Sequence, residues 1–352
     1  NSDFDFIIYE KGETLNLEEG FGIQLAVNSV SILNQVGFNS LSKSEIYNPT
    51  EIDFYSNKDK ICDLDLTQFN SETNKYTTLK RSSLIKFLKD KLFSNLIRFN
   101  KTIKSVEQDQ GILKIKFKDG TNEEVDYLVV SDGVFSHTKS IVEKKIFKPN
   151  YYGAIAIRTQ IKAIDLFEFK TKNISLFMGS KIHLISYPVN DSGDINVVCI
   201  LRKELNEKKS IEQLLSEKFV NKNKHLLNLF KGDLKSWSIY TSPKPIKSIL
   251  KKVFYIGDAF YTFPPTFAQG ASQSIESAKE LYDLLTENKQ NIENTYFEKR
   301  LKKISMINNR SRLNYFAFHF SNPVLKMFRN QFLKRLIKSK SFINRYLGKI
   351  YN

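Results

Sequence analysis

Residues 253–281 hold the types and spacing best suited to chemistry on a bound ligand. An apolar strand is predicted to end at Gly257 and Asp258, and a proline-rich turn follows. The next three residues are predicted to begin a helix: Gln269, Gly270 and Ala271. Glycine lets a backbone approach a ligand closely, and a carboxylate accepts hydrogen bonds from sugar hydroxyls. Because a helix N-terminus presents free N–H groups to an electron-rich group, this order of elements indicates a ligand site.

A second turn of similar composition lies upstream. The apolar strand that begins at residue 126 ends in Asp132 and Gly133, and Ser136 and Lys139 follow. Residues 4–9 are predicted to form another strand, which ends in Glu10. Strands that end in acidic and glycine-rich turns are typical of α/β folds that bind ligands at the carboxyl ends of their strands.

These motifs together resemble the FAD-dependent aromatic hydroxylases, the single-component flavoprotein monooxygenases. Residues 253–281 are similar to that family's GDAAHxxxPxxxQGxxxxxEDA, and residues 126–139 to its DLLVGADGxxSxVR. Arg81 stands where the family has the arginine of RxxLxxxL, and residues 18–37 resemble GxGIxLxPNAxxxLxxLG. The C-terminal region is similar to the subgroup that includes salicylate hydroxylase.

The resemblance implies FAD as cofactor, with NAD(P)H and O2 as co-substrates. The residues that it implies for FAD binding are Glu10, Arg81, Asp132, Gly133, Gly257, Asp258, Gln269, Gly270 and Ala271. Glu10 would hold the adenosine ribose, and Asp132 would lie near the pyrophosphate and the nicotinamide. Pro265 would lie beside the reactive face of the flavin ring. In the family, a flavin hydroperoxide delivers an oxygen atom to an electron-rich aromatic ring.

The chain also departs from the family pattern. The family begins with a strand, a GxGxxG loop and a helix, and no GxGxxG is present here, so we expect either an N-terminal fragment or loss of the motif. GDAAH reads GDAFY, with Phe260 and Tyr261 in the last two positions. Lys139 replaces the closing arginine of the first motif, and Ser277 replaces an aspartate.

The predicted fold class is α/β: a Rossmann-like FAD-binding domain, incomplete at its N-terminus, with an inserted β-sheet domain and C-terminal helices. We expect the first part of the FAD-binding domain over residues 1–150 and the substrate-binding sheet over 151–245. Residues 246–290 would return to the FAD-binding domain, and 291–352 would be helical. Helices are predicted at 25–35, 82–92 and 211–219, and strands at 96–99, 102–108, 112–118, 123–130, 153–161, 174–178, 182–189, 195–201 and 235–240.

The inserted domain contains the candidate substrate residues. Residues 183–200 resemble the subgroup's HxxxYPxxxGxxxNxVxx, and Arg158 belongs to a stretch similar to YxGxxAxR. Strand alternation puts His183, Ile185 and Tyr187 on one face. If that face meets the flavin, His183 and Tyr187 would orient a phenolate, since a histidine with a near-neutral pKa can exchange the phenol proton. The alternative is a His–Tyr hydrogen bond that only satisfies the sheet face.

Composition limits the remaining possibilities. The chain has 352 residues and a net charge of +16, but Lys, Asn and Ile are frequent throughout, so we expect no nucleic-acid partner. Its two cysteines, Cys62 and Cys199, indicate free thiols in the reducing cytoplasm. The other three histidines show no metal-ligand spacing: His137, His225 and His319. No apolar run is long enough to span a membrane.

The C-terminal region is strongly basic. Residues 323–352 contain eight Lys or Arg residues and no acid, with apolar residues between them. This pattern predicts an amphipathic helix that either contacts an anionic membrane surface on the inner face or packs on the flavin domain.

Three functions therefore remain open. The first is hydroxylation of a small phenolic substrate. The second is a ubiquinone-precursor hydroxylase or another flavin oxidoreductase, which the basic tail would suit. The third is a flavin-free, non-enzymatic protein that binds a membrane surface.

Overall fold

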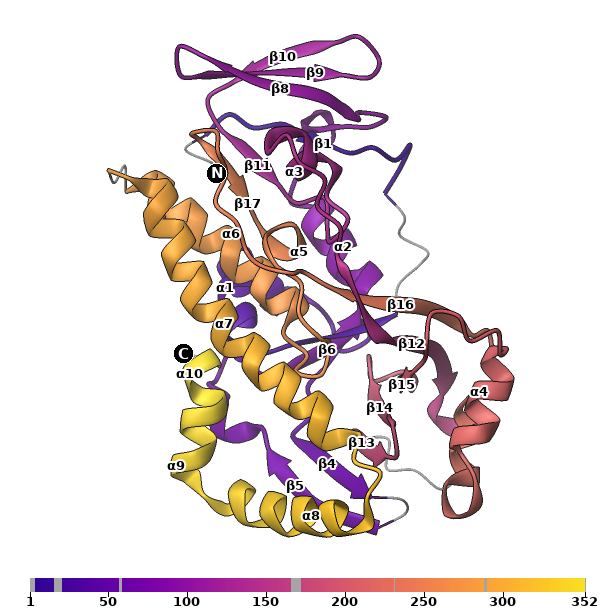
Figure 1. Ribbon diagram of the computed structural model, residues 1–352. Helices are drawn as coiled ribbons and strands as arrows, with labels where there is room; N and C mark the ends of the chain where they lie inside the picture. Colours follow the sequence, from indigo (N-terminus) through magenta and orange to yellow (C-terminus); the bar gives the residue numbers. More distant parts are fainter. Residues whose placement is uncertain are drawn as a thin grey trace.

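The computed structural model describes residues 4–15, 21–56, 59–165, 172–230, 232–287 and 290–351. The described chain is mixed α/β, as predicted, and its long helix α7 (Ile292–Phe318) runs from beside helix α6 (Gly270–Thr286) to the large sheet (Figure 1). The other main helices are α1 (Val27–Asn34), α2 (Arg81–Lys89), α3 (His137–Val142), α4 (Ile211–Lys218), α5 (Gly257–Phe260) and α8 (Pro323–Lys338). Short helices α9 (Lys340–Ile343) and α10 (Lys349–Tyr351) end the chain.

The largest sheet has seven strands in the order β16-β12-β15-β14-β13-β4-β5. The strands are β4 (Glu51–Ser56), β5 (Asp59–Asp65), β12 (Asn150–Lys162), β13 (Ile174–Gly179), β14 (Ile182–Pro188), β15 (Asp194–Arg202) and β16 (Lys235–Thr241). Neighbours are antiparallel except β13 and β4, which are parallel. The five strands from β12 to β16 confirm the sequence prediction. The sequence analysis did not predict β4 and β5, which join the sheet from a part of the chain about a hundred residues upstream.

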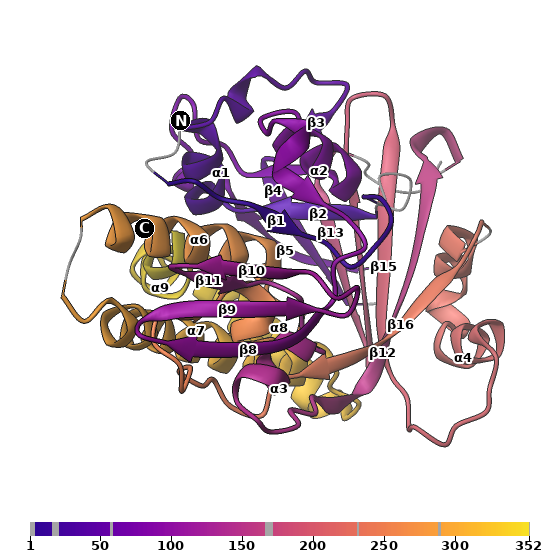
Figure 2. The same cartoon turned by 90° about the horizontal axis from the view of Figure 1, so that it is seen from above.

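The two faces of this sheet have different covers. Helix α4 and the 3₁₀ segment η5 (Asn221–Phe230) pack on one face, over an apolar cluster that includes Ile157, Leu184 and Cys199. Tyr315 of α7 packs on the other face, with Ala156 and Ile200. Figure 2 shows α4 outside the strands β12 and β16, and helices α6 and α7 on the opposite side.

The other described strands form small sheets. Two parallel ladders pair β1 (Ile8–Tyr9) with β7 (Ile97–Arg98) and β11 (Leu128–Val130) with β17 (Val253–Tyr255). A second sheet contains β2 (Gly22–Leu25), β6 (Thr77–Lys80) and β3 (Ile46–Tyr47), and a meander contains β8 (Ile103–Asp109), β9 (Ile112–Phe117) and β10 (Asn122–Val125). The meander stands at one end of the molecule (Figure 1).

The prediction of a single strand over residues 123–130 is wrong. The chain forms β10 in the meander, bends at 126–127, and then forms β11, which pairs in parallel with β17. The alternation of apolar residues continues through the bend, so the pattern alone does not reveal the change of sheet. The helix predicted at 25–35 begins at Val27, because Leu25 still pairs in β2.

Helix α8 lies across the end of the molecule beside β5 (Figure 1). Leu333 and Ile337 pack against the main apolar core, which confirms that part of the helix is structural. The opposite side is not covered: five large apolar residues are exposed there, Val324, Leu325, Met327, Phe328 and Phe332. Within the described ranges, no helix has the length and apolar character that a membrane crossing requires.

Candidate functional site

The two acidic turns lie at one edge of the β11–β17 ladder. Val130 is in register with Tyr255, and both strands run in the same direction. The turns that follow, at Asp132–Gly133 and Gly257–Asp258, therefore leave the ladder at the same end. The carboxyl edge of parallel strands is where α/β folds place their ligands.

Lys139 links these turns directly. Its ammonium group is buried and donates a hydrogen bond to the carbonyl of Ala259, in the short helix α5. Burial lowers the pKa of Lys139, while Asp132 and Glu143 partly offset that effect. Asp132 accepts a hydrogen bond from the backbone N–H of Thr138 at 3.0 Å, which fixes its turn against the start of α3.

Helix α6 begins beside the second turn. Gly257 has φ +55°, and a Cβ at this position would lie 2.7 Å from Oγ of Ser274, one turn into α6. Only glycine fits this approach without strain. The backbone N–H of Gly257 also donates to Oγ of Ser277 at 3.3 Å. The residue that replaces the family's aspartate thus helps to position the turn.

The front of α6 is open. A Cβ added at Gly270 would meet no atom within 4 Å, so the first turn of the helix faces free space. Part of the Asp258 side chain is open to solvent. The protein atoms around its carboxyl group still desolvate it, which raises its pKa. Its carboxylate has no hydrogen-bonding partner among the described residues. An unpartnered carboxylate beside an open helix N-terminus fits a ligand that carries hydroxyl groups and negative charge.

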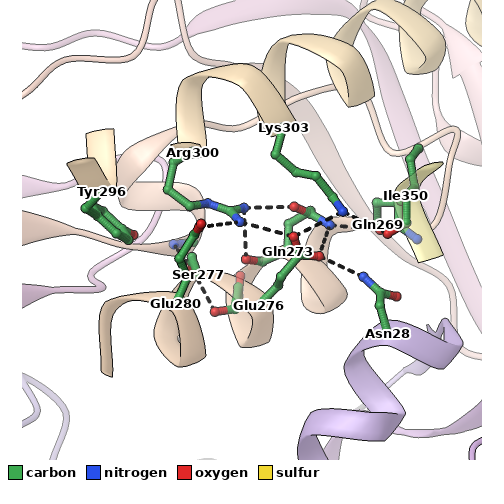
Figure 3. Close-up of polar contacts among 12 residues, drawn as sticks. Asn28, Gln269, Gln273, Glu276, Ser277, Glu280, Tyr296, Arg300, Lys303 and Ile350 are labelled. Carbon is green, nitrogen blue, oxygen red and sulfur yellow. Dashed lines mark hydrogen bonds and ion pairs between the residues drawn. The ribbon is translucent and has the colours of Figure 1, made fainter. Parts of the chain in front are cut away.

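A buried polar network holds α6 from behind (Figure 3). Arg300 of α7 is 1% exposed, and its Nη1 lies 3.3 Å from carboxylate oxygens of both Glu276 and Glu280. Its Nη2 donates to Oε1 of Gln273 at 2.8 Å. Lys303 is a second cation beside Glu276, at 3.3 Å. The network joins α6 to α7 and so holds in place the helix whose N-terminus lies beside Asp258.

Strand β2 connects α6 to the large sheet. Oγ of Ser272 in α6 accepts from the backbone N–H of Ala26 at 3.3 Å. At the other end of β2, Gly22 N–H donates to Oδ1 of Asn196 in β15 at 2.7 Å. Arg81 begins α2 where β6 ends, and its backbone N–H donates to the carbonyl of Phe21. Its exposed guanidinium has no carboxylate partner in the described chain.

One face of the large sheet holds the predicted substrate residues. Register places Ile185 beside Val198, which is beside Arg158, so Arg158 lies on the same face as His183 and Tyr187. The predicted alternation is confirmed, because Ile185 and Tyr187 pack in the main core and Leu184 packs behind the sheet.

Arg158 is a partly buried cation on this face. Its guanidinium lies 5.7 Å from the ring centroid of Trp237, and its Nε is buried without a hydrogen-bonding partner in the part of the chain that is described. Burial is the main cause that lowers its pKa; nearby Tyr187 opposes this effect, and Arg81 adds to it. Two arginines whose charges affect each other, neither with an acidic partner among the described residues, favour a negatively charged ligand nearby.

Gln24 of β2 connects the tyrosines of this region. It accepts a hydrogen bond from the hydroxyl of Tyr76 at 2.8 Å and also interacts with Tyr187. Burial raises the pKa of Tyr187, so its hydroxyl is a neutral hydrogen-bonding group rather than a base.

His183 differs from the sequence expectation in its chemistry. It is 1% exposed, and burial lowers its pKa to about 3 rather than leaving it near neutrality. Its Nδ1 lies 2.7 Å from Nε2 of His319, the residue that follows α7. The expected alternative, a hydrogen bond between His183 and Tyr187, is not among the described contacts.

The proline loop is held by α7 as well. Pro265 is exposed, whereas Thr266 is buried and its Oγ1 donates to the carbonyl of Ser311 at 2.5 Å. The side-chain amide of Asn314 donates to the carbonyl of Thr266 at 3.3 Å. Helix α7 therefore contacts the loop at Pro265 through Ser311 and Asn314. It reaches the sheet face at His319, the residue that follows it.

Glu10 stands apart from the other predicted residues. It ends β1 in the other parallel ladder, and its Oε1 accepts from the backbone N–H of Gly12 at 2.7 Å. None of the described contacts joins Glu10 to the turns at Asp132 and Asp258. The structure thus brings the turns at Asp132 and Asp258 together near α6 and leaves Glu10 in a separate element.

Sequence reasoning missed several residues that the site depends on. Arg300 and His319 lie on α7, and each meets a partner far away in the sequence. One signal was present: Tyr315 and His319 are four residues apart and share a helix face, next to the predicted substrate domain. Among the described residues, no group of histidine, cysteine and acidic side chains could hold a metal ion.

Comparison with known proteins decides the family. A family model described as "FAD binding domain" matches residues 12–307. The chain belongs to this family. It is an FAD-dependent oxidoreductase of the aromatic-hydroxylase group of flavoprotein monooxygenases.

Relatives and solved structures agree with this assignment. A 3-amino-4-hydroxybenzoate 2-monooxygenase from Streptomyces platensis is 23% identical over 330 residues, which are 89% of this chain and 82% of that protein. A 6-hydroxynicotinate 3-monooxygenase from Pseudomonas fluorescens is 24% identical over 81% of this chain and 77% of its own. Klebsiella pneumoniae HpxO, solved with FAD and uric acid, superposes with a TM-score of 0.84 at 16% identity, covering 97% of this chain and 89% of HpxO. The last comparison shows a shared fold.

Proposed function

We propose that this FAD-dependent family member hydroxylates a small aromatic substrate that carries a phenolic hydroxyl and a negative charge. The observation that carries the proposal is the sheet face that holds Arg158, His183 and Tyr187. A buried polar atom without a hydrogen-bonding partner destabilises the fold unless a ligand supplies that partner. Nε of Arg158 and Nε2 of His183 are such atoms. A phenolate or carboxylate would satisfy both.

The residues around Asp258 and the N-terminus of α6 would hold FAD. Asp258 would accept hydrogen bonds from ribityl or ribose hydroxyls, and the N-terminus of α6 at Gly270 and Ala271 would face the negatively charged edge of the ring. Arg81 would lie against the ring, and Glu10 would hold the adenosine ribose through its second carboxylate oxygen. The chemistry that bound FAD would supply is the transfer of electrons from NAD(P)H to O2 and of one oxygen atom to the aromatic ring of the substrate.

The chain's own residues would orient the substrate. Arg158 would fix its charged group, and His183 and Tyr187 would hold its hydroxyl and so set which ring carbon faces Pro265. Because the face is buried, water would be kept from the reacting atoms. A relative acts on 3-amino-4-hydroxybenzoate by name, and another on 6-hydroxynicotinate; both are small aromatic acids with a ring hydroxyl, which supports this substrate class.

The test is a flavin titration followed by a substrate screen. We expect the visible spectrum of a stoichiometric FAD complex, and then NAD(P)H oxidation that depends on a phenolic acid and yields a hydroxylated product. Arg158→Met should raise KM for the acid far more than for the corresponding phenol without a carboxylate. Equal effects on both compounds would overturn the assignment of Arg158 to the charged group.

We also propose that the enzyme contacts an anionic membrane surface through α8. Phe328 and Phe332 are each 62% exposed, and no acidic residue occurs after Glu298. Aromatic side chains beside cations suit the headgroup region of such a surface. This contact would suit a lipid-soluble quinone precursor as the alternative substrate.

Vesicle sedimentation tests the contact. The protein should bind vesicles that contain phosphatidylglycerol and not vesicles of phosphatidylcholine alone, and Phe328→Ser with Phe332→Ser should abolish binding. Binding by the double variant equal to that of the wild type would exclude α8 as the contact.

A further inference from the structure

His183 and His319 form a buried pair at the end of α7. Nδ1 of His183 lies 2.7 Å from Nε2 of His319, and the ring centroids are 4.9 Å apart. The residues are 1% and 3% exposed. One belongs to the sheet and the other to the helix that holds the loop at Pro265, so the pair joins the two walls of the proposed substrate site.

The distant nitrogen of each ring is unpaired. Nε2 of His183 and Nδ1 of His319 are buried, and neither has a hydrogen-bonding partner in the described chain. Burial also lowers the pKa of both rings, and His183 and Arg202 lower that of His319 further. Both rings are therefore neutral near pH 7, and each has one N–H.

A single hydrogen between the rings allows two arrangements. In the first, Nδ1 of His183 donates to Nε2 of His319, so Nε2 of His183 is a free acceptor and the hydrogen of His319 is on Nδ1. In the second, Nε2 of His319 donates, so His183 has its hydrogen on Nε2 and Nδ1 of His319 is the acceptor. In both arrangements the two rings are in the same tautomer.

We propose that this pair is a proton relay for the phenolic substrate, with His319 as its outer member; the proposal rests on the substrate role of His183. Nε2 of His183 takes the proton from the phenol oxygen, the shared hydrogen moves from Nδ1 of His183 to Nε2 of His319, and the Nδ1 hydrogen of His319 leaves to water. The phenol becomes a phenolate, one proton is released, and the pair passes from the first arrangement to the second.

The surroundings explain why two rings are needed. A single buried histidine would have to become charged to accept the proton, and burial opposes that charge. A pair that releases one proton as it takes up another stays neutral. The relay thus raises the electron density of the substrate ring without placing a cation inside the core.

Tyr315 and Arg202 lie next to His319. The ring of Tyr315 lies 4.2 Å from that of His319, and the guanidinium of exposed Arg202 lies 5.4 Å from the Tyr315 ring. Tyr152 packs edge-on against Tyr315 at 4.8 Å. From α8, Arg329 donates a hydrogen bond to the carbonyl of Ala317, two residues before His319. Arg202 is the cation that acts on His319, and it would favour departure of the proton to solvent.

The first experiment measures the tautomers. The chain has four histidines, so ¹⁵N-histidine NMR of the full-length protein resolves each ring, with His225→Gln as an assignment control on the other face of the sheet. We expect His183 and His319 to be neutral from pH 6 to 8 and to share one tautomer. Opposite tautomers, or a charged ring, would overturn the relay.

The second experiment follows the proton. With 4-nitrophenol as probe, wild-type protein should bind the phenol and release one proton, seen with a pH indicator in stopped flow. His319→Gln keeps an amide near the position of Nε2 but cannot pass a proton on, so release should be about 100-fold slower while the Kd changes little. His225→Gln should behave as the wild type.

The outcomes separate the two proposals. If the wild type does not ionise 4-nitrophenol, the assignment of the phenol to this face fails, and the relay fails with it. If the wild type does so and His319→Gln releases the proton equally fast, the relay alone is wrong. A merely structural His319 would change the Kd and the urea midpoint, but not the release rate relative to binding.

Discussion

The ammonium group of Lys139 donates a hydrogen bond to the carbonyl of Ala259, and this contact joins the two acidic turns of the proposed FAD site. The lysine comes from α3, which follows the Asp132 turn, and the acceptor belongs to α5, which contains Asp258. The family has arginine at this position. A lysine is sufficient here because the acceptor is a single carbonyl rather than a planar, bidentate partner.

Lys139→Met should loosen the two turns. The substitution leaves the Ala259 carbonyl without its donor, so we expect stability to fall by roughly 1–2 kcal/mol and the Kd for FAD to rise about tenfold. Urea unfolding and flavin fluorescence measure these changes. Lys145→Met, an exposed lysine six residues on, is the matched control. Equal effects of both substitutions would show that net charge, not the contact, matters.

Asp258→Asn should weaken FAD binding with little change in stability. The carboxylate has no hydrogen-bonding partner among the described residues, and its removal takes away a strong acceptor for hydroxyl groups. We expect the Kd for FAD to rise about 10- to 100-fold, measured by calorimetry. Asp233→Asn, at an exposed site behind the sheet, should leave the Kd unchanged. Unchanged affinity in Asp258→Asn would remove this residue from the site.

Gly257→Ala should displace α5 from α6. The new Cβ would meet Oγ of Ser274 at 2.7 Å, and φ +55° strains any side chain. We expect a loss of about 1–3 kcal/mol in stability, together with weaker FAD binding. Adding Ser274→Ala relieves the contact but not the backbone strain, so the double variant should recover only part of the loss. Full recovery would mean that the contact is the whole cause.

Arg300→Met should be strongly destabilising. It leaves Glu276 and Glu280 without the buried cation that lies 3.3 Å from each. Removing one partner of a buried ion network typically costs roughly 3 kcal/mol or more. Lys303 still neutralises Glu276, so Arg300→Met with Glu280→Gln should be more stable than Arg300→Met alone. Chemical denaturation of the three proteins tests this order.

Stability should fall as the pH is lowered below the ordinary histidine pKa. Burial lowers the folded-state pKa of His183 from 6.5 to about 3 and also lowers that of His319, so the unfolded chain takes up protons first. The stabilisation is complete above pH 6.5 and is lost toward pH 3, with a slope of about 1.4 kcal/mol per pH unit for each histidine. Denaturation curves between pH 7.5 and 5 measure the slope. His319→Gln should reduce it by about half, and an unchanged slope would contradict the assignment.

The sequence predicted the parts of the site that are local. The turns at Asp132 and Asp258, and the helix that begins at Gly270, are encoded by adjacent residues, so their motifs identified them. The contact of His183 with His319 joins positions 136 residues apart, and no local pattern specifies such a pair. The environment of His183 was missed for the same reason, because burial, which lowers its pKa, depends on the packing of α7.

The missed strands have a related cause. Residues 51–65 contain Glu51, Asp53, Asp59, Asp63 and Asp65, a composition that disfavours strands. In the fold, buried Asp53 is 2.7 Å from Lys60 of the same hairpin, so the charge is neutralised locally and the pair can enter the sheet. Pairing with β13, more than a hundred residues on, determines the structure here.

The parallel pairing of β4 with β13 also decides how the chain can be divided. The large sheet needs residues 51–65 as well as 150–241, while the proposed FAD site draws on Arg81 and Asp132 between these segments and on Asp258 after them. Neither the large sheet nor the proposed FAD site is formed by one continuous segment. The hairpin of β4 and β5 therefore leaves the ribosome long before β13, its partner strand, has been synthesised. Until residues 174–179 emerge, that hairpin is an unpaired edge. The order of synthesis, more than the final packing, therefore sets when this enzyme is exposed to aggregation.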